Sequence, residues 1–153
     1  ARPGAARGPG AAALRRTLPM TVIRLLIVDD HDAFLNAAER HLRRVGHVQI
    51  VGRGRNGIEA VALADELKPD IVVLDLAMPE MGGLQATRLI KAQDDPPFVV
   101  VASHFDDVEH REHAQRAGAD AFISKLNYIA ELLPVIEQHA GSRAGDHAPR
   151  DGE

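Results

Sequence analysis

The sequence contains no cysteine and no tryptophan, and aromatic residues make up only 3% of the chain. The absence of cysteine excludes disulfides, thiolate metal ligands and a cysteine nucleophile, and it fits a reducing compartment such as the cytoplasm. The scarcity of aromatic residues argues against a surface that stacks nucleic-acid bases. The longest apolar runs, residues 23–28 and 98–102, are far shorter than the roughly 20 residues that a membrane-spanning helix needs. We therefore expect a cytoplasmic protein without a membrane segment.

The chain of 153 residues is 45% hydrophobic and carries a net charge of −4, which is ordinary for one globular domain. Residues 1–19 contain four arginines and no acidic residue, so the rest of the chain is strongly acidic. An acidic body argues against binding to a nucleic-acid backbone. Residues 1–19 are rich in alanine, glycine and proline, and residues 141–153 are polar. We expect a disordered extension over 1–19, a folded domain over 20–140 and a flexible tail over 141–153.

Within the expected domain, short apolar runs alternate with segments in which apolar residues recur at helical spacing. The runs predict strands at residues 22–28, 48–51, 71–74, 98–102 and 121–124. The periodic segments predict helices at residues 34–45, 60–67, 84–90, 106–117 and 128–139. Because the strands are almost continuously apolar, they indicate an α/β fold with a parallel sheet that is covered by helices on both faces.

Polar residues stand where the predicted strands end, and functional groups of open parallel sheets gather at that edge. They are Asp29, Asp30, Asp75, Ser103 and Lys125. Any one of them could be an ordinary turn or cap residue. Three neighbouring carboxylates, however, repel one another by roughly 3 kcal/mol per pair at an effective dielectric constant of 20, and one lysine cannot neutralise them. Oxygen ligands without histidine or cysteine favour Mg²⁺ as the compensating ion.

Three segments, in this order, resemble the receiver domain of bacterial two-component response regulators. They are residues 27–31 (IVDDH), residues 69–83 (PDIVVLDLAMPEMGG) and residues 117–125 (AGADAFISK), with Ser103 at the end of the fourth strand. The sequence around residues 28–31 and 51–52 is most similar to that of LuxR/NarL-type receivers. The resemblance covers residues 22–139, and it implies a doubly wound sheet of five parallel strands in the order 2-1-3-4-5.

The resemblance also implies the chemistry of the site. Asp75 would accept a phosphoryl group from a sensor histidine kinase or a phosphotransfer protein. Asp30, Asp75 and the backbone carbonyl of Ala77 would hold Mg²⁺, and Asp29 would act on the ion through water. Lys125 and Ser103 would contact the phosphoryl group, and Phe122 would turn inward when Ser103 moves. Such a chain is a signalling switch that at most promotes its own phosphorylation and dephosphorylation.

The expected output surface consists of helix 106–117, strand 121–124 and helix 128–139, which would contact a downstream protein or a second copy of the chain. Its charged residues and aromatic residue are Asp106, Asp107, Glu109, Arg111, Glu112, Arg116, Glu131 and Phe122. Too few residues follow Lys125 for a helix-turn-helix domain, so we expect no contact with nucleic acid. Three residues depart from the family pattern: His104 is bulky, Ala77 has no polar side chain, and Pro134 should bend the last helix.

Two other readings remain open at this stage. A phosphorylation-independent adaptor could use the same fold. Residues 52–57 (GRGRNG) match the G-x-G-x-x-G pattern of dinucleotide-binding loops, although they follow the second strand instead of the first. The pair His110 and His113 lacks a third ligand at fixed spacing, and we interpret it as part of an exposed polar face.

Overall fold

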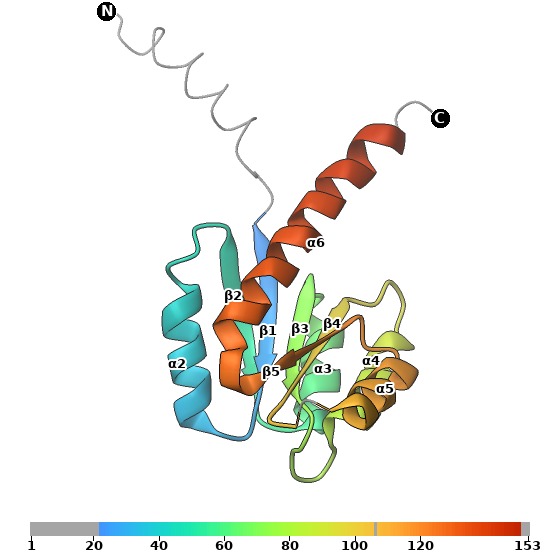
Figure 1. The fold of residues 1–153 in the computed structure, drawn as a ribbon. Helices are drawn as coiled ribbons and strands as arrows, with labels where there is room; N and C mark the ends of the chain where they lie inside the picture. Colours follow the sequence, from blue (N-terminus) through green and yellow to red (C-terminus); the bar gives the residue numbers. More distant parts are fainter. Residues whose placement is uncertain (1–21, 106, 151–153) are drawn as a thin grey trace, which may run out of the picture.

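The computed structural model describes residues 22–105 and 107–150, with side chains to residue 140. Five strands alternate with helices along this part of the chain (Figure 1). The strands are β1 (Ile23–Val28), β2 (Val48–Gly54), β3 (Ile71–Asp75), β4 (Phe98–Ser103) and β5 (Ala121–Ser124). The helices are α2 (Asp32–Leu42), α3 (Gly57–Leu67), α4 (Gly83–Lys91), α5 (Val108–Ala117), the short 3₁₀ helix η1 (Lys125–Asn127) and α6 (Tyr128–Arg150). The sheet order is β2-β1-β3-β4-β5 with every neighbouring pair parallel, so the predicted fold is confirmed.

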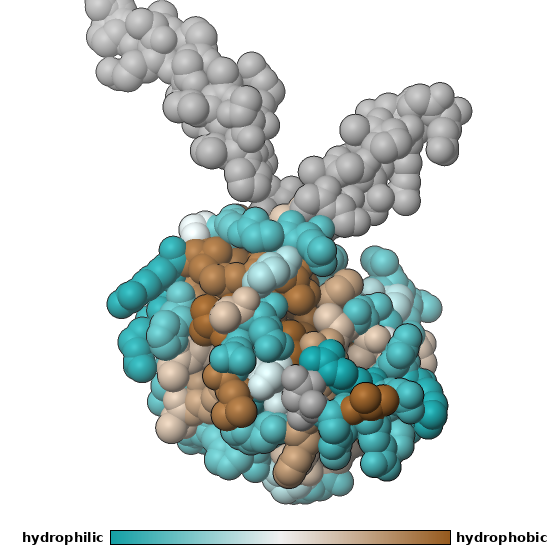
Figure 2. All heavy atoms as spheres, viewed as in Figure 1, coloured by the Kyte–Doolittle hydropathy of each residue, from teal (hydrophilic) through white to brown (hydrophobic). Residues whose placement is uncertain are grey.

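The sheet separates two apolar clusters, because successive side chains of a strand point to opposite faces. On one face, Leu25 and Ile27 of β1 pack with Leu35 of α2 and Leu132 of α6. On the other face, Leu26 of β1 belongs to the cluster that α3, α4 and α5 cover. Figure 1 shows α2 and α6 on one side of the sheet and the other three helices on the other side. In the space-filling view, hydrophobic residues are also visible at the surface between α2 and α6 (Figure 2).

The winding of the chain reverses between β1 and β3, which are neighbours in the middle of the sheet. From β1 the chain continues outward to β2 on one side, whereas β3, β4 and β5 follow on the other side. Val28 of β1 pairs with Leu74 of β3, so the residues that follow them, Asp29 and Asp75, emerge side by side. This reversal places the acidic residues in the crevice where open α/β sheets bind their ligands.

Two helices begin at residues that differ from the prediction, because polar capping residues determine where they start. The second helix begins at Gly57 because the side chain of Asn56 accepts a hydrogen bond from the backbone N–H of Glu59 at 2.8 Å. The fourth predicted helix, 106–117, begins at Val108, after the capping residue Asp107. Asp106 itself lies outside the described residues. Caps of this kind satisfy backbone donors at the first turn, where apolar spacing gives no signal.

The last helix extends further than expected. We predicted that it ends near residue 139 and that a flexible tail follows, but α6 continues to Arg150. Residues 151–153 of that predicted tail lie outside the described residues, as do residues 1–21. Extending an existing helix needs no new nucleation, so a polar segment with alanines can continue it. Pro134 lies on an exposed face of α6, where water can reach the carbonyl that loses its partner.

The glycines of the GRGRNG segment do not form a phosphate-binding loop. Gly52 and Gly54 lie within β2, which is longer than the predicted strand 48–51. A Cβ atom at Gly52 would lie 2.7 Å from a methyl group of Leu67, and one at Gly54 would lie 3.3 Å from Val28. These glycines therefore let α3 and β1 approach β2, and the dinucleotide-binding interpretation is wrong. No helix in the described part of the chain is both long and apolar enough to cross a membrane.

Candidate functional site

Three aspartates gather at the carboxyl edge of β1 and β3. Asp29 and Asp75 are buried, whereas Asp30 lies at the exposed rim. Oxygen atoms of these three residues and a ring nitrogen of His31 all lie within 4.8 Å of one another. The backbone N–H of Asp29 donates to the carbonyl of Gly54 at 3.0 Å, which fixes the end of β1 against β2. The structure thus brings together the three predicted carboxylates at an edge that remains open to solvent at Asp30.

Lys125 places its ammonium group among these carboxylates. It is 96 residues from Asp29 in sequence, yet its Nζ donates to Asp29 Oδ2 at 2.5 Å. The same nitrogen lies 3.6 Å from Asp75 Oδ1. All three side chains are almost fully buried, so water screens their charges weakly. One buried cation faces two buried anions, and the exposed Asp30 adds a third negative charge at the rim.

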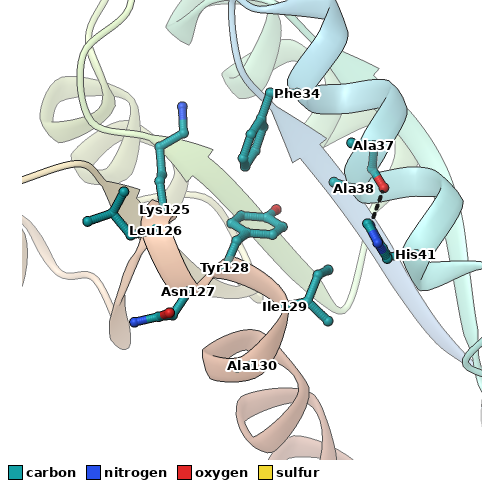
Figure 3. Close-up of a pocket in the computed structure, with 10 residues that line it drawn as sticks. All are labelled: Phe34, Ala37, Ala38, His41, Lys125, Leu126, Asn127, Tyr128, Ile129 and Ala130. Carbon is teal, nitrogen blue, oxygen red and sulfur yellow. Dashed lines mark hydrogen bonds between the residues drawn. The ribbon is translucent and has the colours of Figure 1, made fainter.

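The Phe34 ring contacts Lys125, and a second aromatic ring packs against Phe34. The Nζ of Lys125 lies 4.3 Å from the centre of the Phe34 ring, a cation–π contact. Phe34 in turn meets Tyr128 edge to face, with ring centres 4.7 Å apart. Figure 3 shows Lys125 from the end of β5, Phe34 from α2 and Tyr128 from the start of α6 around one pocket. Burial and the nearby charges of Asp29 and Asp75 raise the pKa of the Tyr128 hydroxyl, so it stays neutral.

His31 faces the same carboxylates from the exposed side. Its Nδ1 lies 3.0 Å from Asp29 Oδ1 and 3.1 Å from Asp30 Oδ1. Its backbone N–H donates to the same oxygen of Asp29 at 2.9 Å. Hydrogen bonding to Asp29 and the charge of Asp30 raise the pKa of His31. Both oxygens of Asp29 therefore have partners. Of the two buried carboxylates, Asp75 makes the longer contact with Lys125, at 3.6 Å against 2.5 Å for Asp29.

The pKa of Asp75 is raised from 3.8 to about 6. Burial is the largest cause, and the negative charges of Asp29 and Asp30 act in the same direction. Lys125 and the backbone N–H of Ala77 oppose the shift without cancelling it. A carboxylate with a raised pKa is destabilised in its charged form, and a nearby cation or a new bond to an electrophile relieves that cost.

Ser103 and Phe122 lie on the β4–β5 side of the site. Ser103 is buried at the end of β4, and its Oγ accepts a hydrogen bond from the backbone N–H of Phe105 at 2.9 Å. Phe122 is half-buried against the cluster beneath α5, and the guanidinium of Arg111 lies 4.8 Å from its ring centre. His104 is exposed beside Ser103. Ser103 thus faces its own loop, and Phe122 is covered by a charged group from α5.

Backbone hydrogen bonds hold the loop between β3 and α4 in place close to Asp75. The backbone N–H of Gly83 donates to the carbonyl of Leu76 at 2.8 Å, and that of Gly57 donates to Met81 at 2.8 Å. Ala77, whose carbonyl is the predicted fourth ligand, is exposed in this loop. A Cβ atom at Gly83 would lie only 2.3 Å from the carbonyl oxygen of Asp75. Only glycine allows α4 to begin so close to the end of β3.

This contact predicts that Gly83→Ala destabilises the protein by about 1–3 kcal/mol, because the added methyl group must displace the backbone of Asp75. Urea unfolding followed by circular dichroism measures the change. Gly46→Ala is the matched control, since nothing lies within 4 Å of a Cβ atom there. Equal stability of the two variants would contradict the tight packing of α4 on the end of β3.

The donor set fits a hard divalent cation. Three aspartates contribute oxygen ligands within 4.8 Å, which suits Mg²⁺, and the exposed Asp30 gives the ion a path from solvent. The single buried ammonium of Lys125 leaves excess negative charge for the ion to neutralise. The other candidate pair does not form such a group: His110 contacts Asp107 at 2.6 Å and stacks on Phe105, and the described residues show no metal-binding cluster around His113.

Sequence reasoning gave no role to Phe34 or to the His31 side chain. The signal for His31 was its place directly after two aspartates at a strand end. Phe34 had no such signal, because its spacing within α2 is that of an ordinary core residue. Its contact with Lys125 joins residues that are far apart in the chain, and only the fold reveals it.

The family of response regulator receiver domains matches residues 25–137 of the chain. The response regulator GacA of Pseudomonas aeruginosa is 38% identical over 124 residues, which are 80% of this chain and 58% of that protein. The response regulator protein VraR of Staphylococcus aureus is 32% identical over 116 residues, or 76% of this chain and 56% of that protein. The chain thus spans a little over half the length of these relatives.

Solved structures show the same fold. A two-component response regulator of the LuxR family from an Aurantimonas species is similar with a TM-score of 0.74 and 30% sequence identity. The similarity covers 80% of this chain and 87% of that one. A DNA-binding response regulator of the LuxR family from Staphylococcus aureus has a TM-score of 0.71 at 27% identity, covering 77% of this chain and 98% of that one.

Proposed function

Because the chain belongs to the response regulator receiver family, we propose that Asp75 is the residue that accepts its phosphoryl group. One observation carries this choice. Asp75 is a buried carboxylate with a raised pKa, 3.6 Å from a buried lysine and beside two further aspartates. Asp29 uses both oxygens on Lys125 and His31, and Asp30 lies at the exposed rim. Asp75 is therefore the carboxylate best placed to act as a nucleophile.

Response regulators receive phosphoryl groups from histidine kinases, and the proposed step follows that chemistry. An oxygen of Asp75 attacks the phosphorus of a phosphohistidine and forms a new P–O bond. The P–N bond breaks, and its electron pair leaves with the imidazole nitrogen, which takes up a proton. The product is an aspartyl phosphate on this chain and a free histidine on the donor. Asp75 must be deprotonated to attack, which its pKa of about 6 permits at neutral pH.

Other residues of the site position the reacting groups and balance their charge. Asp29, Asp30, Asp75 and the Ala77 carbonyl would hold Mg²⁺. When bound, the ion neutralises negative charge on the transferring phosphoryl group. Lys125, already between Asp29 and Asp75, would turn one N–H toward a phosphoryl oxygen. The Ser103 hydroxyl would exchange its contact with the Phe105 amide for one with the phosphoryl group.

Incubation with acetyl phosphate and Mg²⁺ tests this proposal by intact-protein mass spectrometry. The wild type should gain one phosphoryl group, and it should gain none when a chelator removes Mg²⁺. Asp75→Asn should stay unmodified, since an amide nitrogen is a poor nucleophile. Robust labelling of Asp75→Asn would exclude Asp75 as the acceptor. Failure of the wild type with acetyl phosphate and with a phosphorylated histidine kinase would favour the phosphorylation-independent adaptor.

The output surface is proposed to lie on α5, β5 and the start of α6. Movement of Ser103 would free space next to β5, and the Phe122 ring could then turn away from Arg111. This change would alter a surface that offers charge pairs to a downstream protein or a second copy of the chain. The switch acts through this surface and not on an external substrate.

This output surface predicts where the protein responds to a phosphoryl mimic. Beryllofluoride bound at Asp75 should change amide hydrogen exchange or chemical shifts most at residues 103–117 and 122–133. The reason is that Ser103 and Phe122 lie on adjacent strands, β4 and β5, which share the site. Changes confined to the surroundings of Asp75, or found mainly in α2 and α3, would contradict the proposed surface.

A further inference from the structure

We propose that His31 supplies a nitrogen ligand to the cation site of Asp29, Asp30 and Asp75. The site would then favour borderline divalent ions, such as Co²⁺ and Zn²⁺, over Mg²⁺ more strongly than three carboxylates alone would. The proposal rests on the proposed function, because it concerns the same cation site. Within that site, His31 would decide which ion is bound.

The distances around the imidazole carry the argument. Nδ1 of His31 lies 3.0 Å from Asp29 Oδ1 and 3.1 Å from Asp30 Oδ1. Adjacent ligands of one six-coordinate ion with bonds of about 2.1 Å are separated by about 3.0 Å. The ring nitrogen therefore already has the spacing of a ligand that shares an ion with both carboxylates. The oxygen of Asp75 falls within the same group, whose members all lie within 4.8 Å of one another.

The ring is free to adjust without disturbing the fold. Its side chain is 67% exposed, on the open side of the site. His31 is the N-cap residue of α2, but its side chain makes no capping hydrogen bond. The backbone N–H of the residue, which any variant retains, donates to Asp29 Oδ1 at 2.9 Å. The imidazole can thus exchange its hydrogen bond to Asp29 and its ion-pair contact with Asp30 for a bond to an ion between them.

The chemistry of imidazole decides for which ions the affinity of the site rises. Carboxylate and carbonyl oxygens suit Mg²⁺, whereas a neutral imidazole suits Co²⁺, Zn²⁺ and their neighbours. Adding one nitrogen to an oxygen set therefore raises the affinity for these ions and contributes little for Mg²⁺. The exposed position of His31 and Asp30 lets an ion meet the nitrogen as it enters the site.

Isothermal titration of the metal-free full chain with Co²⁺ and with Mg²⁺ at about pH 8 tests the proposal. His31→Ala should weaken Co²⁺ binding about tenfold and change Mg²⁺ binding less than about threefold. His41→Ala is the matched control, since His41 is an exposed histidine of the same helix that contacts the Ala37 carbonyl. It should change neither affinity. Titration with Zn²⁺ should also shift the Nδ1 resonance of His31 in ¹⁵N NMR spectra.

His31→Asp separates a nitrogen ligand from added charge. Its carboxylate should strengthen Mg²⁺ binding without restoring the preference for Co²⁺. Restoration of that preference, or a ratio of the two affinities that His31→Ala leaves unchanged, would overturn the proposal. A rise in both affinities in His31→Ala would also overturn it, because the ring would then be a competitor of the ion. Absence of Mg²⁺ binding in the wild type would instead contradict the proposed function.

Discussion

Asp75→Asn is expected to raise the free energy of unfolding of the metal-free protein by about 1–3 kcal/mol near pH 8, although it removes the phosphorylation site. The pKa of Asp75 is about 6 in the folded protein and close to 3.8 in the unfolded chain. The folded protein thus binds the proton of the Asp75 carboxyl group more tightly than the unfolded chain does. The stability that the protonated form contributes is fully present below about pH 4 and is lost as the pH rises through about 6. An uncharged amide at this position avoids that loss.

Urea denaturation at several pH values measures this effect. The advantage of Asp75→Asn should be largest near pH 8 and should fall toward zero near pH 4. Asp65→Asn is the control, since Asp65 is an exposed aspartate that pairs with the exposed Lys68. It should change stability by less than about 0.5 kcal/mol. An Asp75→Asn protein that is less stable than the wild type near pH 8 would contradict the electrostatic account of the site. Saturating Mg²⁺ should reduce the advantage, since the wild type then gains from ion binding.

The second large effect is expected for Lys125→Met, which should lower the free energy of unfolding by about 3–5 kcal/mol near pH 8 without metal. The substitution keeps most of the side-chain volume but removes the ammonium group between Asp29 and Asp75. Both carboxylates are almost fully buried, so they would remain charged without a compensating cation. The loss should be smaller near pH 5, where Asp75 takes up a proton.

Two further variants isolate the cause. Lys68→Met removes an exposed lysine that pairs with Asp65 at 3.3 Å, and it should change stability by less than about 1 kcal/mol. The double variant Lys125→Met with Asp29→Asn should recover part of the lost stability, because it removes one of the two uncompensated charges. If Lys125→Met alone were as stable as the wild type, Lys125 would not be the counter-ion of this site.

The sequence predicts the parts of the fold that depend on continuous apolar segments. The runs that became β1, β3 and β4 are almost entirely buried, and all four predicted runs including β5 lie within about one residue of their expected bounds. The strand β2 is longer than expected, because Gly52, Arg53 and Gly54 have low strand preference and pair with β1 only through the tertiary fold. The carboxylates were predictable as a group, since the ends of adjacent parallel strands meet at one edge.

The remaining features depend on contacts between distant segments or on weak local preferences. The cation–π contact joins Phe34 on α2 to Lys125 after β5, and neither local sequence predicts this contact. The orientation of the His31 ring toward both aspartates depends on the path of the chain between the end of β1 and the start of α2. The continuation of α6 beyond residue 139 depends on small differences in helix preference that polar residues and glycines leave close to balance.

The most direct test of the account is to locate the phosphoryl group after reaction with acetyl phosphate and Mg²⁺. Reduction of the acyl phosphate with borohydride converts the modified aspartate to homoserine, and peptide mass spectrometry then identifies its position. We expect homoserine at position 75 and unmodified aspartate at positions 29 and 30. Homoserine at position 29 or 30, with Asp75 unmodified, would contradict it.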